Sequence, residues 1–327
     1  MNDLDPILQA DELLQRDAPA LWAALSPLGR RLRQPANFLP HQTAEARGKP
    51  FNATIGQITD GRGSAVPLPT MAAALAGLEP QEASQSFLYS PVEGLALLRR
   101  RYRDWQRRGL PESLPSTLPL VTNGVLHSRG LALQIFVPAG RTVIALGGAG
   151  DARLRELVEV RLGGRLVELG KGNSAPEALE QALFQLPEGE PAIILVEPWA
   201  DSEDGEPERR PAGDRVALVE RLLDLAKRRP LVVAIDDRWE PLAAPASLFW
   251  DLAGRSESLI PVKLGGAEGS WGFAGGRVGF LTFGYPEESG VARALESKVK
   301  MLLRAEVGSP SAFAQTLFLK MLEGVAI

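Results

Sequence analysis

Short apolar runs alternate with helix-forming segments through the middle of the chain. Residues 142–146, 192–196 and 231–235 are almost entirely apolar, which is typical of strands that are buried on both faces of a sheet. Strands that alternate with helices form βαβ units. The pattern therefore predicts an α/β fold with a mostly parallel sheet sandwiched by helices. Further strands are expected at residues 120–122, 165–169, 259–264 and 278–283, and helices at residues 126–136, 153–160 and 215–228.

Both ends of the chain carry helical patterns instead. Residues 1–50 are helix-prone and rich in arginine, and residues 51–56 form a short extended segment. An amphipathic helix is expected over residues 91–106, with a proline near its first turn, and two more helices over residues 288–304 and 310–323. We therefore expect an N-terminal helical segment (1–50), a large α/β domain (51–286) and C-terminal helices (287–327).

The composition is close to that of an average globular protein, with 45% apolar and 23% charged residues. The net charge of −4 and the lack of a basic block give no sign of a nucleic-acid surface. No apolar run approaches the ~18 residues of a membrane-spanning helix, and the N-terminus is acidic rather than apolar. We therefore expect a cytoplasmic protein.

The inventory of reactive side chains is small. The absence of cysteine excludes disulfides, thiolate metal sites and a cysteine nucleophile, and two histidines, His41 and His127, argue against a histidine-rich metal centre. Any mechanism that needs a lysine amine must use one of seven residues. These are Lys49, Lys171, Lys227, Lys263, Lys298, Lys300 and Lys320.

Glycine-containing segments lie at two of the expected strand ends, where ligands of open α/β sheets bind. Asn123 and Gly124 precede a helix whose first backbone N–H groups, beginning at Val125, would point at an anion. An ordinary turn explains the same residues. Seven glycines lie between positions 265 and 279, and they fit either a phosphate site or a flexible loop before a strand. Their spacing does not match a dinucleotide-binding fingerprint.

Two carboxylates, Asp236 and Asp237, directly follow the apolar run at residues 231–235. An aspartate at this place can pair with a ring nitrogen or a cation. It can equally cap a helix or form a salt bridge with Arg238. The sequence leaves both interpretations open.

In chain order, these segments resemble the motifs of the class I/II pyridoxal-phosphate-dependent aminotransferases, which have fold type I. The resemblance covers residues 51–323, beginning with Asn52-Ala53-Thr54-Ile55-Gly56 on the substrate side. The other similar segments are Tyr89-Ser90-Pro91-Val92-Glu93-Gly94 with Leu98-Arg99, Val121-Thr122-Asn123-Gly124, Asp236-Asp237-Arg238-Trp239, Gly276-Arg277-Val278-Gly279-Phe280 and Ala314-Gln315-Thr316-Leu317.

The resemblance implies a role for each matching residue. Tyr89 would reach the cofactor phosphate of a neighbouring subunit, which implies a dimer. Asp236 would pair with the pyridine nitrogen of pyridoxal phosphate, and Trp239 stands where the family has a tyrosine. The phosphate would be held by Asn123, Gly124, Val125 and Arg277.

The main departure from the family is a missing lysine. The family's Schiff-base lysine lies eight residues before the phosphate-binding arginine, and here that position is Gly269. Glycine has no amine and cannot form the covalent link to the cofactor. Lys263 lies six residues upstream on the incoming strand, ~20 Å away along an extended chain. We therefore expect Lys263 to be a strand residue whose head is paired or reaches solvent.

Other family residues are also absent. Ala200 stands where an asparagine would bond the phenolic oxygen of the cofactor, and residues 147–151 contain no aromatic ring to stack on it. The family's C-terminal small domain, with the arginine that binds the substrate carboxylate, would follow Ile327. We expect a truncated C-terminal domain.

These departures favour a non-catalytic homologue of the aminotransferases. Such a protein either binds pyridoxal phosphate without a covalent link or binds none, and serves as a partner subunit, in a homodimer or in a heterodimer with an intact paralogue. One alternative is an active aminotransferase that uses another lysine or a second chain. Another is a binding module for a different phosphorylated molecule at Asn123, Gly124 and Arg277. A fourth is a decaying or truncated gene copy.

Overall fold

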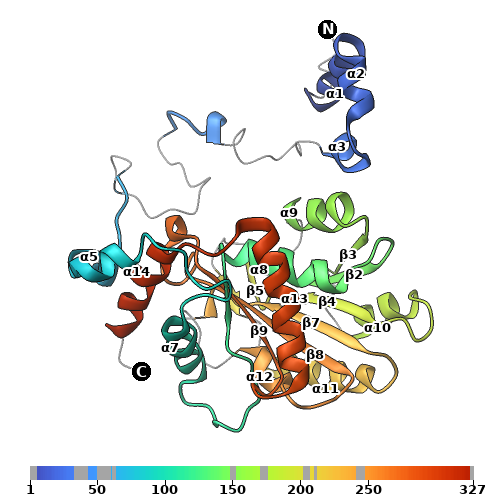
Figure 1. Ribbon diagram of the computed structural model, residues 1–327. Coiled ribbons are helices and arrows are strands. Elements are labelled where there is room, and N and C mark those ends of the chain that lie inside the picture. Colours follow the sequence, from blue (N-terminus) through green and yellow to red (C-terminus); the bar gives the residue numbers. More distant parts are fainter. Residues whose placement is uncertain are drawn as a thin grey trace.

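The structure, a computed structural model, describes residues 6–32, 43–49, 60, 64–147, 152–169, 176–201, 207–209, 212–240 and 247–324. Within these residues, seven strands form one sheet (Figure 1). They are β1 (Leu120–Thr122), β2 (Thr142–Leu146), β3 (Arg165–Leu169), β4 (Ala192–Val196), β7 (Leu231–Asp236), β8 (Leu259–Gly266) and β9 (Gly279–Phe283). A separate two-stranded ribbon consists of β5 (Trp199–Asp201) and β6 (Pro207–Arg209).

The strand order of the large sheet is β1-β9-β8-β7-β4-β2-β3. β9 pairs antiparallel with both β8 and β1, while the other neighbours are parallel. Gly279, at the start of β9, lies opposite both Thr122 and Gly266. Because Asp236 pairs with Leu264, the carboxyl ends of β1, β7 and β8 meet at one edge of the sheet. The expected α/β fold with a mostly parallel sheet is confirmed.

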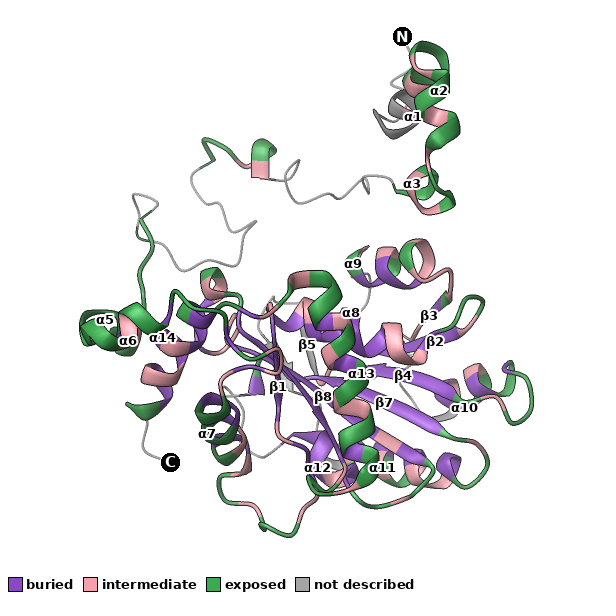
Figure 2. Cartoon of the chain, viewed as in Figure 1, coloured by how far each residue is buried: buried purple, intermediate pink, exposed green. Residues whose placement is uncertain are grey.

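Helices cover both faces of the sheet, and the strands between them are buried (Figure 2). Alternate residues of a strand point to opposite faces. In β2, Val143 and Ala145 belong to one core and Ile144 and Leu146 to the other. The first core is covered by α8 (Val125–Phe136), α9 (Ala152–Arg155), the π-helix Glu156–Arg161 and α13 (Gly290–Val307). The second is covered by α10 (Pro176–Phe184), α11 (Ala212–Ala226) and α12 (Leu248–Leu252).

A third apolar cluster joins α7 (Ala96–Arg107), α14 (Ala312–Glu323) and α5 (Pro69–Ala76) to the strand edge. The ring of Tyr102 stacks on Phe280 of β9, with 3.5 Å between ring centroids. Phe318 of α14 packs against both rings. This aromatic packing fixes α7 against the ends of β8 and β9.

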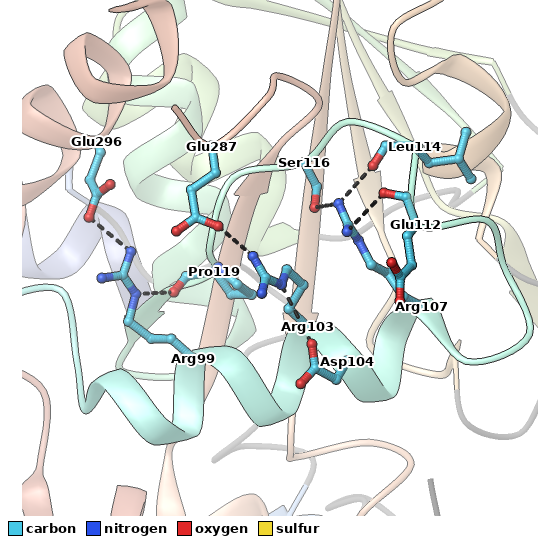
Figure 3. A network of polar contacts seen from close by, with 10 residues as sticks. All are labelled: Arg99, Arg103, Asp104, Arg107, Glu112, Leu114, Ser116, Pro119, Glu287 and Glu296. Carbon is cyan, nitrogen blue, oxygen red and sulfur yellow. Dashed lines mark hydrogen bonds and ion pairs between the residues drawn. The ribbon is translucent and has the colours of Figure 1, made fainter. Parts of the chain in front are cut away.

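Two arginines of α7, Arg99 and Arg107, hold the segment that leads into β1, and Arg103 between them binds the segment after β9 (Figure 3). Arg99 donates to the carbonyl of Pro119 at 2.7 Å and to Glu296 at 2.8 Å. Arg103 pairs with Glu287 at 2.5 Å, and Arg107 donates to the carbonyl of Leu114 at 2.7 Å. These contacts fix the start of β1, and through β1 they position the first turn of α8.

The helical ends and the boundaries differ in detail from expectation. The N-terminal helices are α1 (Pro6–Asp17), α2 (Pro19–Ala24) and α3 (Pro27–Arg31), and α6 (Pro80–Gln85) precedes α7. The helix expected over residues 91–106 begins at Ala96 instead. The carbonyl of Glu93 accepts the N–H of Val121, and Gly94 has a φ of +96°, so this segment is not helical.

Two further expectations concern local structure and division of the chain. The helix expected over residues 153–160 is mainly π-helical, over Glu156–Arg161. The extended segment 51–56 lies outside the described residues. The division at residues 50 and 286 stays a prediction. No described helix is long and apolar enough to cross a membrane.

Candidate functional site

Four segments meet at the edge where β1, β7 and β8 end. They are the first turn of α8, the turn after β7, the loop after β8 and the residues just before β9. The backbone before α8 and the backbone at the start of β9 lie very close together at Gly124 and Gly279. A Cβ built on Gly279 would lie 2.3 Å from the carbonyl carbon of Gly124. Only glycine allows the two backbones to lie this close. The sequence-predicted residues Asn123, Gly124, Val125, Asp236, Trp239 and Arg277 therefore belong to one region.

The N-terminus of α8 faces a carboxylate of the chain itself. Gly124 has a φ of +90° and precedes the helix, and the backbone N–H of Val125 points to both oxygens of Glu268, each at 3.1 Å. Thr122 Oγ1 donates to the carbonyl of Gly124 at 3.0 Å and lies 2.7 Å from Ser128 Oγ. The free N–H groups and dipole of a helix N-terminus favour a negative charge at this place.

Arg277 completes the contacts of that carboxylate. Its Nη1 lies 3.0 Å from Glu268 Oε1, and its Nη2 donates to the carbonyl of Asn123 at 3.3 Å. Arg277 has a φ of +51°, and it is the one non-glycine residue in the described ranges with a left-handed backbone. Such a conformation is uncommon outside glycine and asparagine. We call the Val125 N–H and the Arg277 guanidinium the anion cradle.

Glu268 fills the anion cradle. Its side chain is largely buried, with 12% of its surface exposed. Burial raises the pKa of Glu268, although the Val125 N–H and the Arg277 charge both act to lower it. A Cβ on Gly124 would lie 2.0 Å from Oε1, and a Cβ on Gly266 would lie 2.3 Å from Oε2. The two glycines therefore keep open the space that this carboxylate occupies.

Asp236 is likewise bound by a side chain of its own turn. The carboxylate is buried, and Arg238 Nε donates to Oδ1 at 2.9 Å while Nη2 pairs with Oδ2. This is one of the two interpretations that the sequence allowed, an ion pair with Arg238. The resemblance gives this carboxylate the pyridine nitrogen as its partner, whereas in the structure its partner is Arg238.

Gly269, the position at which the resemblance places the Schiff-base lysine, has no room for a side chain. A Cβ on Gly269 would lie 2.5 Å from the carbonyl oxygen of Arg238 and 3.0 Å from a ring carbon of Trp239. Ser270 holds the two loops together, since its Oγ donates to the same carbonyl at 3.1 Å. A side chain at position 269 would therefore meet backbone atoms.

Lys263 is paired, as expected, but it is fully buried and does not reach solvent. Its Nζ lies 3.1 Å from Asp237 Oδ2 and 2.7 Å from Glu240 Oε1. Asp237 also accepts a hydrogen bond from Ser247. Burial raises the pKa of Glu240, against the opposing effect of the Lys263 charge. The amine is thus held inside the protein, on the side of α7 and α12.

The remaining expected residues lie nearer the surface. Trp239 is 39% exposed and Tyr89 is 96% exposed, in the loop before α7. His127 Nδ1 accepts the N–H of Asn123 at 3.0 Å, and its Nε2 lies 2.8 Å from Glu306. His127 therefore stabilises the turn before α8. The segments Asn52–Gly56 and Gly148–Asp151 lie outside the described residues, and of Ala200 only the backbone, in β5, is described.

Sequence reasoning missed Glu268, the side chain that occupies the anion cradle. The residue type of Glu268 gave no signal, because an isolated glutamate is usually exposed. For Arg238 the sequence offered a salt bridge with the neighbouring aspartates as one of two interpretations. Glu240 gave no signal, because only the fold brings it to Lys263.

A polar cavity of about 650 Å³ lies at the opposite end of β1, away from this site. Its arginines, Arg103 and Arg107, already bind carboxylates or backbone carbonyls (Figure 3). The groups that the sequence singles out do not line it. The candidate site is therefore the edge around Glu268.

Several solved structures of aminotransferases have this fold. An aminotransferase from Anaerococcus prevotii matches with a TM-score of 0.69 at 15% identity, over 87% of this chain and 71% of that chain. Cytoplasmic aspartate aminotransferase from Saccharomyces cerevisiae gives 0.69 at 15% identity, over 94% and 76%. The aromatic-amino-acid aminotransferase from Burkholderia pseudomallei, covalently bound to pyridoxal phosphate, gives 0.62 at 16% identity, over 87% and 71%.

The chain therefore has the fold of the pyridoxal-phosphate-dependent aminotransferases, fold type I. At 15–16% identity, the likeness extends to the fold alone. No protein-family model matches the sequence, and no curated protein matches it.

The residues at the site do not fit pyridoxal phosphate as they stand. A phosphate group would need the anion cradle, which Glu268 fills. A pyridine nitrogen would need Asp236, whose two oxygens pair with Arg238. A covalent link would need an amine at position 269, where there is no side chain and no room for one.

Proposed function

We propose that this chain is a non-catalytic protein with the aminotransferase fold that acts as a partner subunit. The observation that carries the proposal is Gly269, where the lysine position has neither an amine nor space for a side chain. Transamination uses that lysine twice, to carry the cofactor and to move the proton. Removing a group with such a double role costs several orders of magnitude in rate.

Lys263 is a poor substitute for the missing amine. It is fully buried and is bound by two carboxylates, Asp237 and Glu240. Both ion pairs would have to break before this amine could reach an aldehyde. These contacts support the proposal against the alternative of an active aminotransferase that uses a nearby lysine.

The experiment is to incubate the purified chain with pyridoxal phosphate, record the visible spectrum, reduce with borohydride and map adducts by mass spectrometry. An active aminotransferase treated in parallel is the positive control, and the Lys263→Met variant tests that amine directly. We expect no aldimine band and no stoichiometric adduct on one lysine. An aldimine band whose reduced adduct maps to a single lysine would overturn the proposal, as would turnover of amino donors with keto acids.

Exposed apolar side chains support the partner role. Phe87, Leu88 and Tyr89 follow one another in the chain and are 84%, 68% and 96% exposed. Contiguous exposed apolar groups are typical of protein interfaces. We propose that they bind a second subunit, either another copy of this chain or an intact homologue. The cytoplasmic location stays a prediction.

A second candidate function is the binding of another phosphorylated molecule at Asn123, Gly124 and Arg277. These residues do lie together, and Arg277 remains half-exposed. Such a ligand would have to displace Glu268 first. Non-covalent binding of pyridoxal phosphate would require Arg238 to leave Asp236 as well.

A further inference from the structure

A buried group of ionisable side chains lies on the side of the sheet that α7 covers, and its charges do not balance. Lys263 contributes one positive charge, and Asp237 and Glu240 contribute up to two negative charges. Each of the three side chains is at most 4% exposed. We propose that Glu240 takes up a proton when the chain folds, and that the loss of this proton at higher pH loosens the turn after β7. The inference does not depend on whether the chain is catalytic.

The contacts of the two acidic side chains differ. Asp237 Oδ2 accepts hydrogen bonds from Lys263 Nζ at 3.1 Å and from Ser247 Oγ. Glu240 uses Oε1 alone, at 2.7 Å from Lys263 Nζ, and its buried Oε2 has no hydrogen-bond partner among the described residues. Hydrogen bonds to a carboxylate favour its charged form. The proton therefore belongs on Glu240 rather than on Asp237.

The other charged and titratable groups that face Glu240 do not supply the missing positive charge. Tyr102 of α7 stays neutral, because burial and the nearby carboxyl groups raise its pKa well above the usual range. Arg108, just after α7, is exposed at the surface. Burial and repulsion from Asp237 raise the pKa of Glu240, and the attraction of Lys263 and Arg108 does not cancel this rise. A buried carboxyl without a counter-ion of its own favours the neutral form.

The helix that covers this group offers an acceptor for the proton. Gln106 of α7 is 3% exposed, and its Oε1 has no hydrogen-bond partner among the described residues. A Cβ built on Gly265 would lie 2.4 Å from Tyr102 Oη and 3.6 Å from Gln106 Nε2. Gly265 is two residues from Lys263 in β8, so both positions are on the same face of the sheet. The Gln106 amide thus lies on the face where Lys263 meets Glu240, and a protonated carboxyl is the kind of donor that its oxygen needs.

The turn that Glu240 closes belongs to the candidate site. The backbone N–H of Glu240 donates to the carbonyl of Asp237 at 3.0 Å. Between these two residues, Arg238 pairs with Asp236, and the Arg238 carbonyl accepts the hydroxyl of Ser270 at 3.1 Å. A second negative charge next to Asp237, in a region of low dielectric, repels the first. Ionisation of Glu240 therefore acts on the same turn that closes the space at Gly269.

The test compares the native chain with Glu240→Gln in urea unfolding at a series of pH values. Glutamine keeps the shape of the side chain and cannot ionise. A carboxyl whose pKa is higher in the folded than in the unfolded state binds an extra proton on folding, so stability falls as the pH rises between the two pKa values. We expect the native chain to lose stability relative to Glu240→Gln from about pH 4.3, the usual pKa of glutamate, up to the raised pKa.

The slope of that loss should approach about tenfold in the unfolding equilibrium constant per pH unit, the value for one proton. Glu257→Gln is the matched control, because Glu257 is exposed, and its curve should run parallel to that of the native chain. Infrared difference spectra at about pH 6, above the usual pKa of glutamate, provide a second readout. The carbonyl band of a protonated carboxyl should be present in the native chain and missing in Glu240→Gln.

The loosening of the turn has a readout of its own. Trp239 lies in this turn and is 39% exposed, so its fluorescence should change as the pH rises through the raised pKa of Glu240. The change should be absent in Glu240→Gln, and Trp239→Phe assigns it to this ring. A fluorescence that stays constant while the stability curves diverge would overturn the coupling to the turn.

Parallel stability curves for the native chain and Glu240→Gln would overturn the inference as a whole, as would an infrared band of equal size in both. Circular dichroism shows whether each variant is folded. If Glu240→Gln does not fold, the same measurements on Glu240→Met decide, since methionine has a similar length and no titrating group. None of these outcomes affects the adduct mapping that tests the absence of catalysis.

Discussion

The Nζ of Lys263 lies 2.7 Å from Oε1 of Glu240, in a part of the protein where neither side chain is exposed by more than 4%. Asp237 lies on the other side of the same ammonium, at 3.1 Å. Two carboxyl groups and one ammonium thus share a buried site. Lys263, the lysine nearest to Gly269 in the sequence, is therefore the counter-ion of two buried carboxyl groups.

Replacing Lys263 by methionine should therefore destabilise the protein. The change leaves two buried carboxyl groups without their cation, and breaking a buried pair in this way costs about 3–5 kcal/mol. Urea unfolding followed by circular dichroism measures the loss. Lys227→Met is the control, because Lys227 is exposed and its contact with Asp224 is 3.4 Å long, and we expect little change there. Equal stability of the two variants would show that the buried pair does not hold the turn after β7.

Substitution at Gly269 should also be destabilising. A Cβ there would lie 2.5 Å from the carbonyl oxygen of Arg238, and forcing an atom into a packed region costs about 1–3 kcal/mol. Gly275→Ala is the matched control, since a Cβ at that glycine meets nothing within 4 Å. Thermal melting compares the two variants. For the same reason we expect that Gly269→Lys does not restore an aldimine band with pyridoxal phosphate.

If Gly269→Ala melts at the same temperature as Gly275→Ala, the loops at Arg238 and Gly269 are able to separate. In that case Gly269→Lys should be retested for an aldimine, because a lysine would then have room.

The affinity of the native chain for sulfate should rise as the pH falls. Burial raises the pKa of Glu268 above its usual range, so this carboxyl becomes neutral at a higher pH than an exposed glutamate would. The neutral form no longer competes as an anion for Arg277. Sulfate keeps its charge over this pH range, so its own titration does not contribute. Titrations at a series of pH values measure the effect.

The Glu268→Ala variant provides the comparison for that pH series. It lacks the titrating group, so its sulfate affinity should change much less with pH. A parallel pH dependence in both proteins would assign the effect to other groups.

The strands were predictable because the buried strands coincide with short apolar runs in the sequence. The run at residues 142–146 is a strand over the same five positions, and the run at residues 231–235 extends by one residue to Asp236. The start of α7 was not predictable, because Pro91 is a good first-turn residue, whereas contacts with distant residues, such as Glu93 with Val121 and Leu95 with Gln315, hold the segment in a turn. Local patterns do not contain such long-range contacts.

In the candidate site, too, the local sequence predicted some features, and long-range contacts decided the others. Gly269 was found by counting from Arg277, and the structure adds that the position has no room for a side chain. The occupation of the cradle by Glu268 could not be found from its residue type, because an isolated glutamate is usually exposed. Its position follows from the pairing of β8 with β9, which brings the loop after β8 to the first turn of α8.

The exposed run at Phe87, Leu88 and Tyr89 gives a prediction about assembly. If these side chains bind a second copy, replacing all three by serine should weaken self-association about tenfold or more, since a few large apolar residues carry most of the binding energy of an interface. Sedimentation equilibrium measures the association constant. Phe184→Ser is the matched control, because Phe184 is 85% exposed but lies in α10, away from this run. A native chain that stays monomeric, and that retains a co-purifying aminotransferase only while the run is intact, would assign the surface to a heterodimer.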